Sequence, residues 1–492
     1  MSENGERRLA AKGIMGTMLL DSDQCYRALV SHDSRFDGRF FVGVGTTGIY
    51  CRPVCTARTP LRHNCSFFPS AAAAEAKGYR PCLRCRPELA PGYAAVDANR
   101  RLAQSAARLI EDGRLQDASL AEVADELRVT DRHLRRVFQQ EFGVAPVEYA
   151  QTQRLLLTKR LLTDTDMAVL DVAMASGFAS LRRFNDLFRT RYRMTPGELR
   201  RARARRTPVE KLAFDLAYRP PYDWPWMLAF LQRRAIAGVE VIDAKRYRRT
   251  LRVGNATGWI EVSPSPRRPA LRVVVSASLA RAIPIVLART KSLFDLACRP
   301  DEIAATLGPL AAMNPGIRLP GAVDGFEVAV RAILGQQITV KAATTIAGRF
   351  ARAFGESIEA PHAGLDTLFP TPARIATLTE SEIARLGIIA SRARAILAMA
   401  RELETGKLRL DPSADVDATL AALIELPGVG PWTAHYIAMR ALAWPDAFPH
   451  PDVAALKALR LTGARALAAA ERWRPWRGYA LMHLWKSLEE TT

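Results

Sequence analysis

Residues 51–85 read CRPVCTARTPLRHNCSFFPSAAAAEAKGYRPCLRC, and this stretch decides the fold of the N-terminal part of the chain. Two cysteine pairs mark its ends, Cys51 with Cys55 and Cys82 with Cys85. Each pair can occupy one edge of a tetrahedron around Zn²⁺, with Zn–S distances of about 2.3 Å. The spacing therefore predicts a four-cysteine zinc site in a small domain, and on spacing alone such a site can be purely structural.

The other cysteines argue against a disulfide scaffold. Seven cysteines in 492 residues are too few for one. Cys25 and Cys65 lie near the tetrad but outside it, and we expect both to be small buried side chains. The apolar run at 13–20 follows basic residues, as in a secretion signal, but it holds two glycines and lacks a cleavage site. A reducing, cytoplasmic location is therefore expected.

Composition predicts a large, soluble protein with a polyanionic partner. With 70 Lys+Arg against 50 Asp+Glu, the net charge is +20, so a polyanionic partner is expected. Hydrophobic residues make up 49% of the chain, enough for packed cores. Because no stretch approaches the roughly 18 apolar residues that a bilayer crossing needs, we expect no membrane association. At about 150 residues per domain, the length predicts three or more domains.

An internal repeat follows the cysteine-rich segment. Residues 122–149 align with residues 171–199 at an offset of 49 to 50 residues, with aromatic residues in matching positions. Each unit has the pattern of a helix, a short turn and an amphipathic helix, which predicts two tandem helix-turn-helix units rather than an ordinary bundle with a basic face. The candidate DNA-binding side chains on the two second helices are Arg132, Arg135 and Arg136, and Arg182 and Arg183.

The arginine run at 200–206 is typical of a linker, and the chain changes character after it. Residues 208–290 alternate short β-rich runs with turn residues, which predicts a small antiparallel sheet. The remainder is an Ala-, Leu- and Arg-rich helical region. The sequence thus predicts a multidomain α+β protein. Its expected parts are a zinc domain (1–88), an all-α tandem helix-turn-helix domain (89–206), a small antiparallel α+β domain (207–290) and an all-α helix-hairpin-helix domain (291–492).

The hairpin expectation rests on residues 426–442, LPGVGPWTAHYIAMRAL. Gly428 and Gly430 lack side chains, so the backbone amides between two helices can approach a DNA phosphate. Taken alone, the motif is also compatible with a routine tight turn. Further on, prolines precede Asp452, which by local pattern is an N-cap of a new helix.

The cysteine-rich region resembles the N-terminal domain of Ada-type alkylation sensors, through residues 40–70 and 78–88. The resemblance implies that Cys51 is both a zinc ligand and a nucleophile that irreversibly takes a methyl group from a DNA methylphosphotriester. Zinc keeps thiols deprotonated and nucleophilic. Arg58 and Arg84 are candidates for holding neighbouring phosphates. Methylation changes the charge of the four-thiolate zinc site from −2 to −1, which should strengthen DNA binding.

The repeat region resembles AraC-type DNA-binding domains, which follow the zinc domain in that sensor family. This resemblance implies promoter DNA as a partner, in addition to alkylated double-stranded DNA, and RNA polymerase as a further expected partner. The arginines of the two second helices would enter successive major grooves.

Residues 214–240, 319–339, 426–442 and 473–485 together resemble 3-methyladenine DNA glycosylase II, the AlkA-like family. The resemblance implies that Asp452 is the catalytic carboxylate in hydrolysis of an N-glycosidic bond. It also implies that the aromatic rings of Trp432, Tyr436 and Trp485 stack on the flipped cationic base, and that Gln337 fills the gap left in the duplex. At the position of Gln337 the family has an apolar residue. Where the family has an acidic pair, this chain has Pro451 followed by Asp452.

Several absences narrow the expected chemistry. No lysine occurs from residue 408 to 456, so the hairpin cannot supply a Schiff-base amine, and a monofunctional glycosylase is expected. No cysteine cluster follows the hairpin, so no iron–sulfur cluster is expected. The surroundings of Cys298 do not match the Pro-Cys-His-Arg site of O6-alkylguanine methyltransferases.

The whole chain thus resembles a fusion of a methylphosphotriester-sensing transcriptional activator with a base-excision glycosylase. Two other interpretations remain open at this stage. The C-terminal half could be a non-catalytic DNA-binding platform of a pure regulator. Alternatively, the zinc domain could be structural and the chain a repair enzyme with accessory DNA-binding modules.

Overall fold

The computed structural model describes residues 21–90, 98–111, 113–203, 212–266 and 268–489. The apolar run at 13–20 and part of the arginine run at 200–206 lie outside these ranges. Among the described residues, no helix has the length and apolar character that a bilayer crossing requires.

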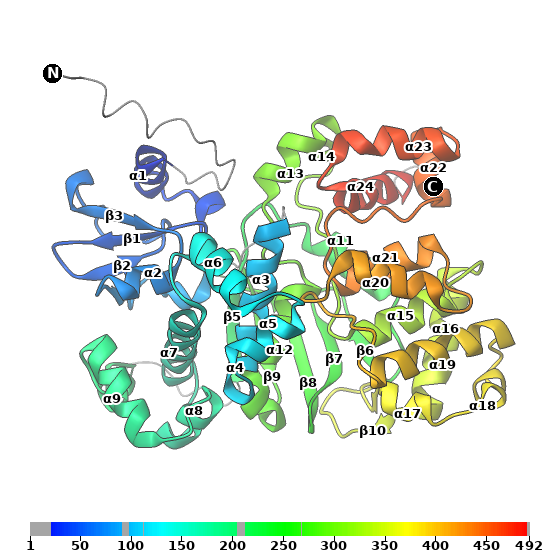
Figure 1. The fold of residues 1–492 in the computed structure, drawn as a ribbon, viewed down its shortest axis with the longest axis horizontal. Coiled ribbons are helices and arrows are strands. Elements are labelled where there is room, and N and C mark those ends of the chain that lie inside the picture. Colours follow the sequence, from blue (N-terminus) through cyan, green and yellow to red (C-terminus); the bar gives the residue numbers. More distant parts are fainter. Residues whose placement is uncertain (1–20, 91–97, 112, 204–211, 267, 490–492) are drawn as a thin grey trace.

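The first unit is a small sheet with two helices (Figure 1). Its strands have the order β3-β1-β2-β4, and only β2 and β4 pair in parallel. The apolar cores of this unit are small, as in many small domains that need a metal or another constraint for stability. The elements are α1 (Ser22–Val30), β1 (Phe41–Val44), β2 (Ile49–Cys51), β3 (Cys65–Phe68), α2 (Ala71–Ala76) and β4 (Arg80–Pro81), with 3-10 turns at Ser34–Phe36, Arg62–Asn64 and Pro87–Leu89.

The second unit is helical, and the repeat appears in it as two helix pairs joined by one long helix. The second helix of each pair begins at a hydroxyl N-cap, Thr130 or Ser180, and buries its matching aromatic residues. The elements are α3 (Ala98–Glu111), α4 (Arg114–Asp117), α5 (Leu120–Glu126), α6 (Asp131–Phe142), α7 (Pro146–Asp164), α8 (Val169–Ala175), α9 (Leu181–Tyr192) and α10 (Pro196–Arg203).

The third unit is an antiparallel sheet with the strand order β5-β9-β8-β7-β6. Buried residues of β7, β8 and β9 lie mostly at every second position with partly exposed residues between them, although Arg249, Thr250 and Leu251 are buried in succession. The elements are β5 (Leu212–Ala217), α11 (Trp224–Gln232), β6 (Glu240–Ile242), β7 (Tyr247–Val253), β8 (Ala256–Pro264), β9 (Ala270–Val275), a 3-10 turn (Ala277–Ala282) and α12 (Ile283–Leu293).

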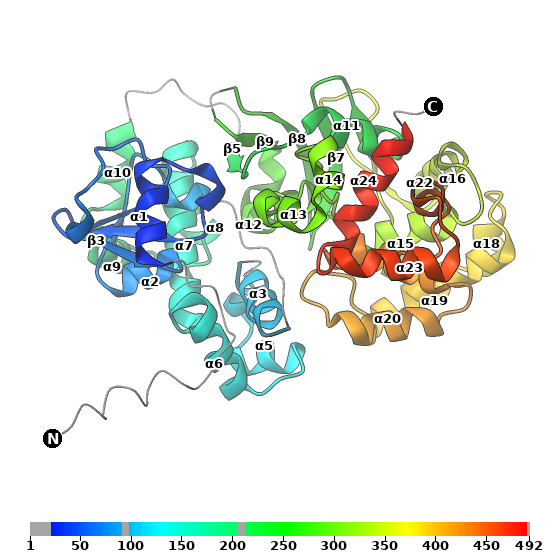
Figure 2. The same ribbon diagram turned by 90° about the horizontal axis from the view of Figure 1, so that it is seen from above.

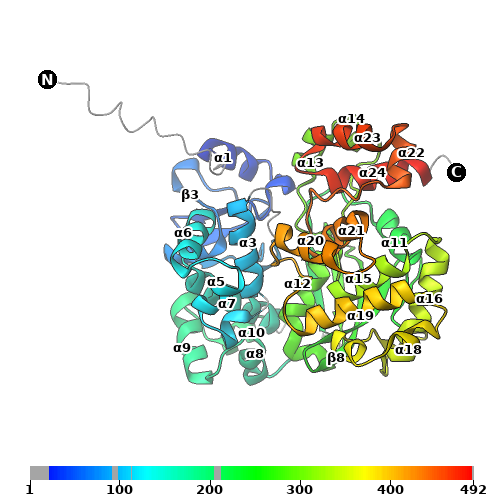
Figure 3. The same ribbon diagram turned by 45° about the vertical axis from the view of Figure 1, so that its right-hand side comes forward.

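The fourth unit is almost entirely helical, and its hairpin is formed by α20 and α21 (Figure 3). A two-stranded ribbon interrupts the helices. The elements are α13 (Pro300–Leu307), α14 (Pro309–Met313), α15 (Gly325–Leu334), α16 (Val340–Phe354), β10 (Glu356–Ser357), β11 (Thr367–Leu368), α17 (Pro372–Ala376), α18 (Glu380–Ala384), α19 (Ala390–Glu404), α20 (Val416–Glu425), α21 (Pro431–Ala441), α22 (Val453–Leu459), α23 (Gly463–Ala470), a 3-10 turn (Glu471–Trp473) and α24 (Arg477–Glu489). The predicted fold class is confirmed.

The N-terminal half (21–203) and the C-terminal half (212–489) pack against each other (Figure 2). A continuous apolar core runs from α7, α8 and α9 into the five-stranded sheet. Within it, the guanidinium of Arg160 lies 4.9 Å from the centre of the Phe214 ring and donates to the Asp215 carbonyl at 3.1 Å. The described structure is therefore one packed molecule.

Candidate functional sites

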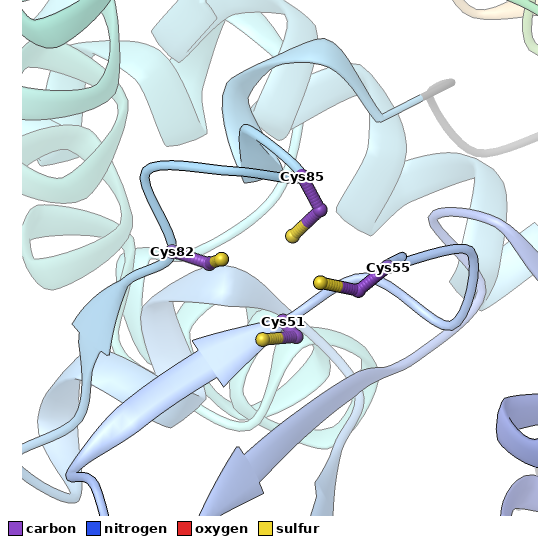
Figure 4. Close-up of side chains that lie close together, drawn as sticks. All are labelled: Cys51, Cys55, Cys82 and Cys85. Carbon is purple, nitrogen blue, oxygen red and sulfur yellow. The ribbon is translucent and has the colours of Figure 1, made fainter. Parts of the chain in front are cut away.

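The four cysteines of the predicted tetrad converge on one point. Their sulfur atoms lie within 4.8 Å of one another (Figure 4). The parallel pairing of β2 with β4 brings this about, because it places Cys51, the last residue of β2, beside Cys82, which directly follows β4. Four converging thiols fit a tetrahedral Zn²⁺ ion.

Cys51 and Cys85 are partly exposed, whereas Cys55 and Cys82 are buried. Backbone amides donate to two of the sulfurs: Arg52 N–H to Cys85 at 3.3 Å and Arg84 N–H to Cys82 at 3.4 Å. Such N–H donors favour the thiolate form. The site thus brings four sulfurs together, and Cys51 and Cys85 are its more accessible members.

The cysteines outside the tetrad are buried, as expected. Burial raises the pKa of the Cys25 thiol to about 11 and that of Cys298 to about 12, and it also raises the pKa of Cys65. At neutral pH these thiols remain protonated and weakly nucleophilic.

The arginines around the tetrad divide into two groups. Arg58 and Arg84 are exposed, and the guanidinium of Arg84 donates to the Thr56 carbonyl at 3.3 Å. Arg52 is buried, donates from Nε to Asp37 at 2.7 Å and also reaches the Cys85 carbonyl at 3.1 Å. Of these three described arginines, Arg58 and Arg84 are therefore the accessible ones.

The five candidate arginines of the repeat are exposed on α6 and α9. Arg135 forms an exposed ion pair with Asp131 at 3.0 Å, and Arg136 lies 3.0 Å from a ring nitrogen of His133. Exposed pairs of this kind contribute little to stability, so these side chains can exchange partners with DNA.

In the C-terminal half, a cavity of about 920 Å³ gathers the remaining candidates. Its wall is formed mainly by α15, α16, α21, α22 and α24. A cavity of this size can admit a purine nucleotide. Gln337, Gly428, Gly430, Trp432, Tyr436, Asp452 and Trp485 all line it.

Asp452 is 7% exposed and caps α22. Its Oδ1 accepts from the backbone N–H of Ala455 at 2.8 Å and from the indole N–H of Trp485 at 3.0 Å. Its Oδ2 accepts from the indole N–H of Trp432 at 3.1 Å. The indole contacts were not anticipated from the sequence, because the three side chains come from different helices.

Each tryptophan is stacked on a second ring. Trp432 lies parallel to Tyr436, with ring centres 5.2 Å apart and planes 9° apart. Trp485 stacks on Phe230 of α11, with centres 6.4 Å apart and planes 11° apart. Phe230 was missed by the sequence analysis, since it lies in a different unit and an apolar helical residue carries no distinguishing signal.

Two guanidinium groups contact Tyr436 and Phe230, the residues on which the tryptophans stack. Arg440 donates to the Tyr436 hydroxyl at 2.8 Å, and Arg234 lies 3.8 Å from the centre of the Phe230 ring. Although burial raises the pKa of Tyr436, Arg440 and Arg234 lower it, and the net result is a pKa below the ordinary value. Arg440 follows Tyr436 at i+4 on α21, a spacing that could have indicated the contact.

Gln337 stands exposed on the turn between α15 and α16, with a φ of 54°. The preceding Gln336, which the sequence analysis did not single out, donates to the Gly428 carbonyl at 2.9 Å and to the Thr433 hydroxyl at 3.1 Å. Gly428 itself has a φ of 78°, which favours glycine. These bonds fix the turn against the hairpin.

Family models match four consecutive regions of the chain. They are described as the metal binding domain of Ada (24–88), a helix-turn-helix domain (123–202), the AlkA N-terminal domain (213–324) and the HhH-GPD superfamily of base excision DNA repair proteins (330–464).

Relatives match the same regions singly or together. The chain is 38% identical over 273 residues to DNA-3-methyladenine glycosylase 2 of Escherichia coli, a match that covers 55% of this chain and 96% of that protein. It is also 38% identical over 137 residues to the bifunctional transcriptional activator/DNA repair enzyme Ada of the same organism, covering 27% of this chain and 37% of Ada.

One relative matches nearly end to end. The "Probable bifunctional transcriptional activator/DNA repair enzyme AlkA" of Mycobacterium tuberculosis is 38% identical over 485 residues, which cover 95% of this chain and 97% of the relative. The order of the four matched regions and this near-complete alignment show that the chain belongs to the family of bifunctional transcriptional activator/DNA repair enzymes.

Proposed function

We propose that the chain detects methylphosphotriesters in DNA, activates transcription in response, and hydrolyses the N-glycosidic bond of alkylated bases such as 3-methyladenine. The observation that carries the repair activity is Asp452, a buried carboxylate in the wall of a purine-sized cavity lined by aromatic rings. We assign sensing to residues 1–88, promoter binding to 89–206 and base excision to 207–492, with 207–290 supporting the helical domain 291–492.

In the glycosylase reaction, the damaged nucleotide leaves the duplex and enters the cavity, while Gln337 occupies the vacated space. Trp432, Tyr436 and Trp485 stack on the cationic base, and each cation–π contact contributes about 0.5 to 2 kcal/mol. The bond between C1′ and the base nitrogen breaks, and its electron pair leaves with the base. The charge of Asp452 stabilises the oxocarbenium-like sugar until a water adds to C1′ and releases a proton.

These roles of the aromatic rings and of Asp452 suit a substrate base that is already cationic. An alkylated purine is a good leaving group, so the enzyme needs little acid catalysis and mainly needs a negative charge beside the sugar. Because a water supplies the new bond, the product is an abasic site with an intact strand, as expected of a monofunctional glycosylase.

The sensing reaction uses Cys51, Cys55, Cys82 and Cys85 as zinc ligands, and the bound Zn²⁺ would keep the four sulfurs deprotonated. Cys51 is partly exposed at the edge of the cluster. Its sulfur forms a bond to the methyl carbon as the ester oxygen–carbon bond breaks, and a normal phosphodiester is released. Arg58 and Arg84 would hold the phosphates on either side.

The regulatory outcome follows from charge. Loss of one negative charge at the cluster weakens its repulsion of the DNA backbone, so promoter binding through the exposed arginines of α6 and α9 strengthens. We place this activity in the cytoplasm, with RNA polymerase as the partner of the promoter-bound form.

Separation of the two activities tests the proposal. Full-length protein is incubated with methylated duplex DNA, and both free base and protein mass are measured. Wild type should release base and gain about 14 Da on Cys51. Asp452→Asn should gain the mass without releasing base, and Cys51→Ser should release base without gaining mass. If either variant kept both activities, the residue replaced in it would not have the proposed role.

A further inference from the structure

The hydrogen bonds to Asp452 are distributed unequally between its two oxygens. A carboxylate oxygen has about two acceptor positions. Oδ1 accepts from Ala455 N–H at 2.8 Å and from Trp485 Nε1–H at 3.0 Å, so both of its positions are occupied. Oδ2 accepts from Trp432 Nε1–H at 3.1 Å. Among the described residues, one acceptor position of Oδ2 thus remains for a substrate or a water.

Neighbouring aromatic rings fix the planes of the two indole rings. Trp432 packs beside Tyr436 with ring centres 5.2 Å apart, and Trp485 packs beside Phe230 with ring centres 6.4 Å apart, both in nearly parallel, offset arrangements. A stacked ring has a fixed plane, and the direction of its N–H lies in that plane. The two N–H groups therefore have a fixed direction before a substrate binds.

The base-stacking role assigned to these tryptophans does not require either N–H. Stacking uses the face of a ring, and a phenyl ring provides one as well. The convergence of two indole N–H groups on the same carboxylate, from α21 and α24, is a separate feature of this site.

We propose that Trp432 and Trp485 are positioning residues that act on Asp452 through their indole N–H groups and aim Oδ2 at the sugar. This inference rests on the proposed glycosylase function. It also specifies how Asp452 works. Three donors hold the carboxylate in one orientation, so its charge has a fixed place beside the sugar.

The inference predicts a rate effect that stacking alone would not produce. Removing one indole N–H while keeping the ring leaves the stack in place but removes a bond that orients the carboxylate. The maximal rate should therefore fall about tenfold, since a hydrogen bond to a charged group is worth about a factor of ten or more.

The experiment replaces the N–H but keeps the ring. Trp432 and Trp485 are each replaced by 3-benzothienylalanine, which has the shape of tryptophan with sulfur in place of N–H, and by phenylalanine. Trp444→Phe is the matched control, because its Nε1 is buried and finds no acceptor among the described residues. Single-turnover base release from methylated duplex DNA is measured from pH 5 to 9, with Asp452→Asn in parallel.

The expected result is a lower rate for both replacements at Trp432 and at Trp485, with the Trp444 control unchanged. Benzothienylalanine variants with the wild-type rate would overturn the inference, even if the phenylalanine variants were inactive, because shape and stacking would then suffice. If Asp452→Asn itself released base at the wild-type rate, the proposed function would fail instead, so the two failures are distinguishable.

Discussion

At the scale of single residues, Asp452 shows how one position can satisfy two requirements. By local pattern it is an N-cap, and the structure shows the cap hydrogen bond to Ala455 N–H. The cap fixes the carboxylate at the wall of the cavity. A structural role therefore supports the catalytic role that we propose.

Gln337 is expected to trade stability for function. A non-glycine residue at a φ of 54° is strained by about 1 kcal/mol or more. Gln337→Gly should therefore raise the free energy of unfolding slightly, yet lower base release from fully paired DNA about tenfold, because nothing fills the vacated space. A lesion opposite a mismatch should be affected less, since it is already partly unstacked. Single-turnover assays on paired and mismatched duplexes check this, and equal losses on both would contradict it.

Glu75 should make stability depend on pH. This carboxyl is buried where α2 meets α7, and it accepts from the Tyr50 hydroxyl at 3.0 Å and from Thr152 at 3.2 Å. Burial raises its pKa to about 7. Since the folded state favours the protonated form, this contribution to stability is complete below about pH 4.5 and is lost as the pH rises through about 7.

Glu75→Gln should remove that dependence. The variant should resemble wild type at pH 5 and be more stable at pH 8, by up to about 3 kcal/mol. Denaturant unfolding at the two pH values measures the difference. A variant whose stability follows the wild-type pH dependence would show that Glu75 is not the group responsible.

At the scale of elements, α7 connects the metal site to both helix-turn-helix units. Lys159 of α7 is buried and donates to the Cys82 carbonyl at 3.0 Å and to Glu88 at 2.7 Å. Arg86 reaches the same helix through Asp164 at 2.8 Å. The loop that holds two of the four cysteines is thus fixed by charges on the helix that joins the two DNA-binding units.

Lys159→Met should lower the free energy of unfolding by about 3 kcal/mol, because it leaves the buried carboxylate of Glu88 with one counter-charge fewer. The double variant Lys159→Met/Glu88→Gln should recover part of the loss, since the uncompensated charge is gone. Denaturant unfolding of the zinc-loaded full chain measures both. A double variant less stable than the single one would contradict this explanation.

The sequence could predict elements whose signals are local. The cysteine spacing, the repeat with its matching aromatics and the alternation in β7 to β9 each depend on neighbouring residues. It could not predict contacts between distant segments. The buried ion cluster of Glu240, Arg249, Glu327 and Arg331 joins β6 and β7 to α15, and the indole contacts of Asp452 join three helices. Such contacts need the packed structure.

At the scale of the whole molecule, polar contacts supplement the apolar core between the halves. Arg39 reaches Asp301 at 2.8 Å and Glu302 at 2.7 Å, both at the start of α13. On the other side of the interface, Arg409 pairs with Glu126 of α5 at 2.7 Å. The sensing half and the repair half are therefore held in a defined orientation.

Arg39→Ala should lower the free energy of unfolding by about 1 kcal/mol, because two partly buried ion pairs between the halves are lost. Arg35→Ala is the matched control, since Arg35 forms its ion pair with nearby Asp33 in an exposed position. The effect of Arg39→Ala should shrink at high salt. Equal effects of the two substitutions would mean that the contact between the halves contributes nothing.

We propose that the charge of Asp452 drives base release in the C-terminal half. Single-turnover base release from methylated duplex DNA is therefore compared between wild type and Asp452→Asn. Asparagine is as good an N-cap as aspartate, so the fold and the unfolding midpoint should be kept. We expect a loss of about 100-fold or more in the rate, because a preorganised charge is removed. Base release by Asp452→Asn at the wild-type rate would contradict it.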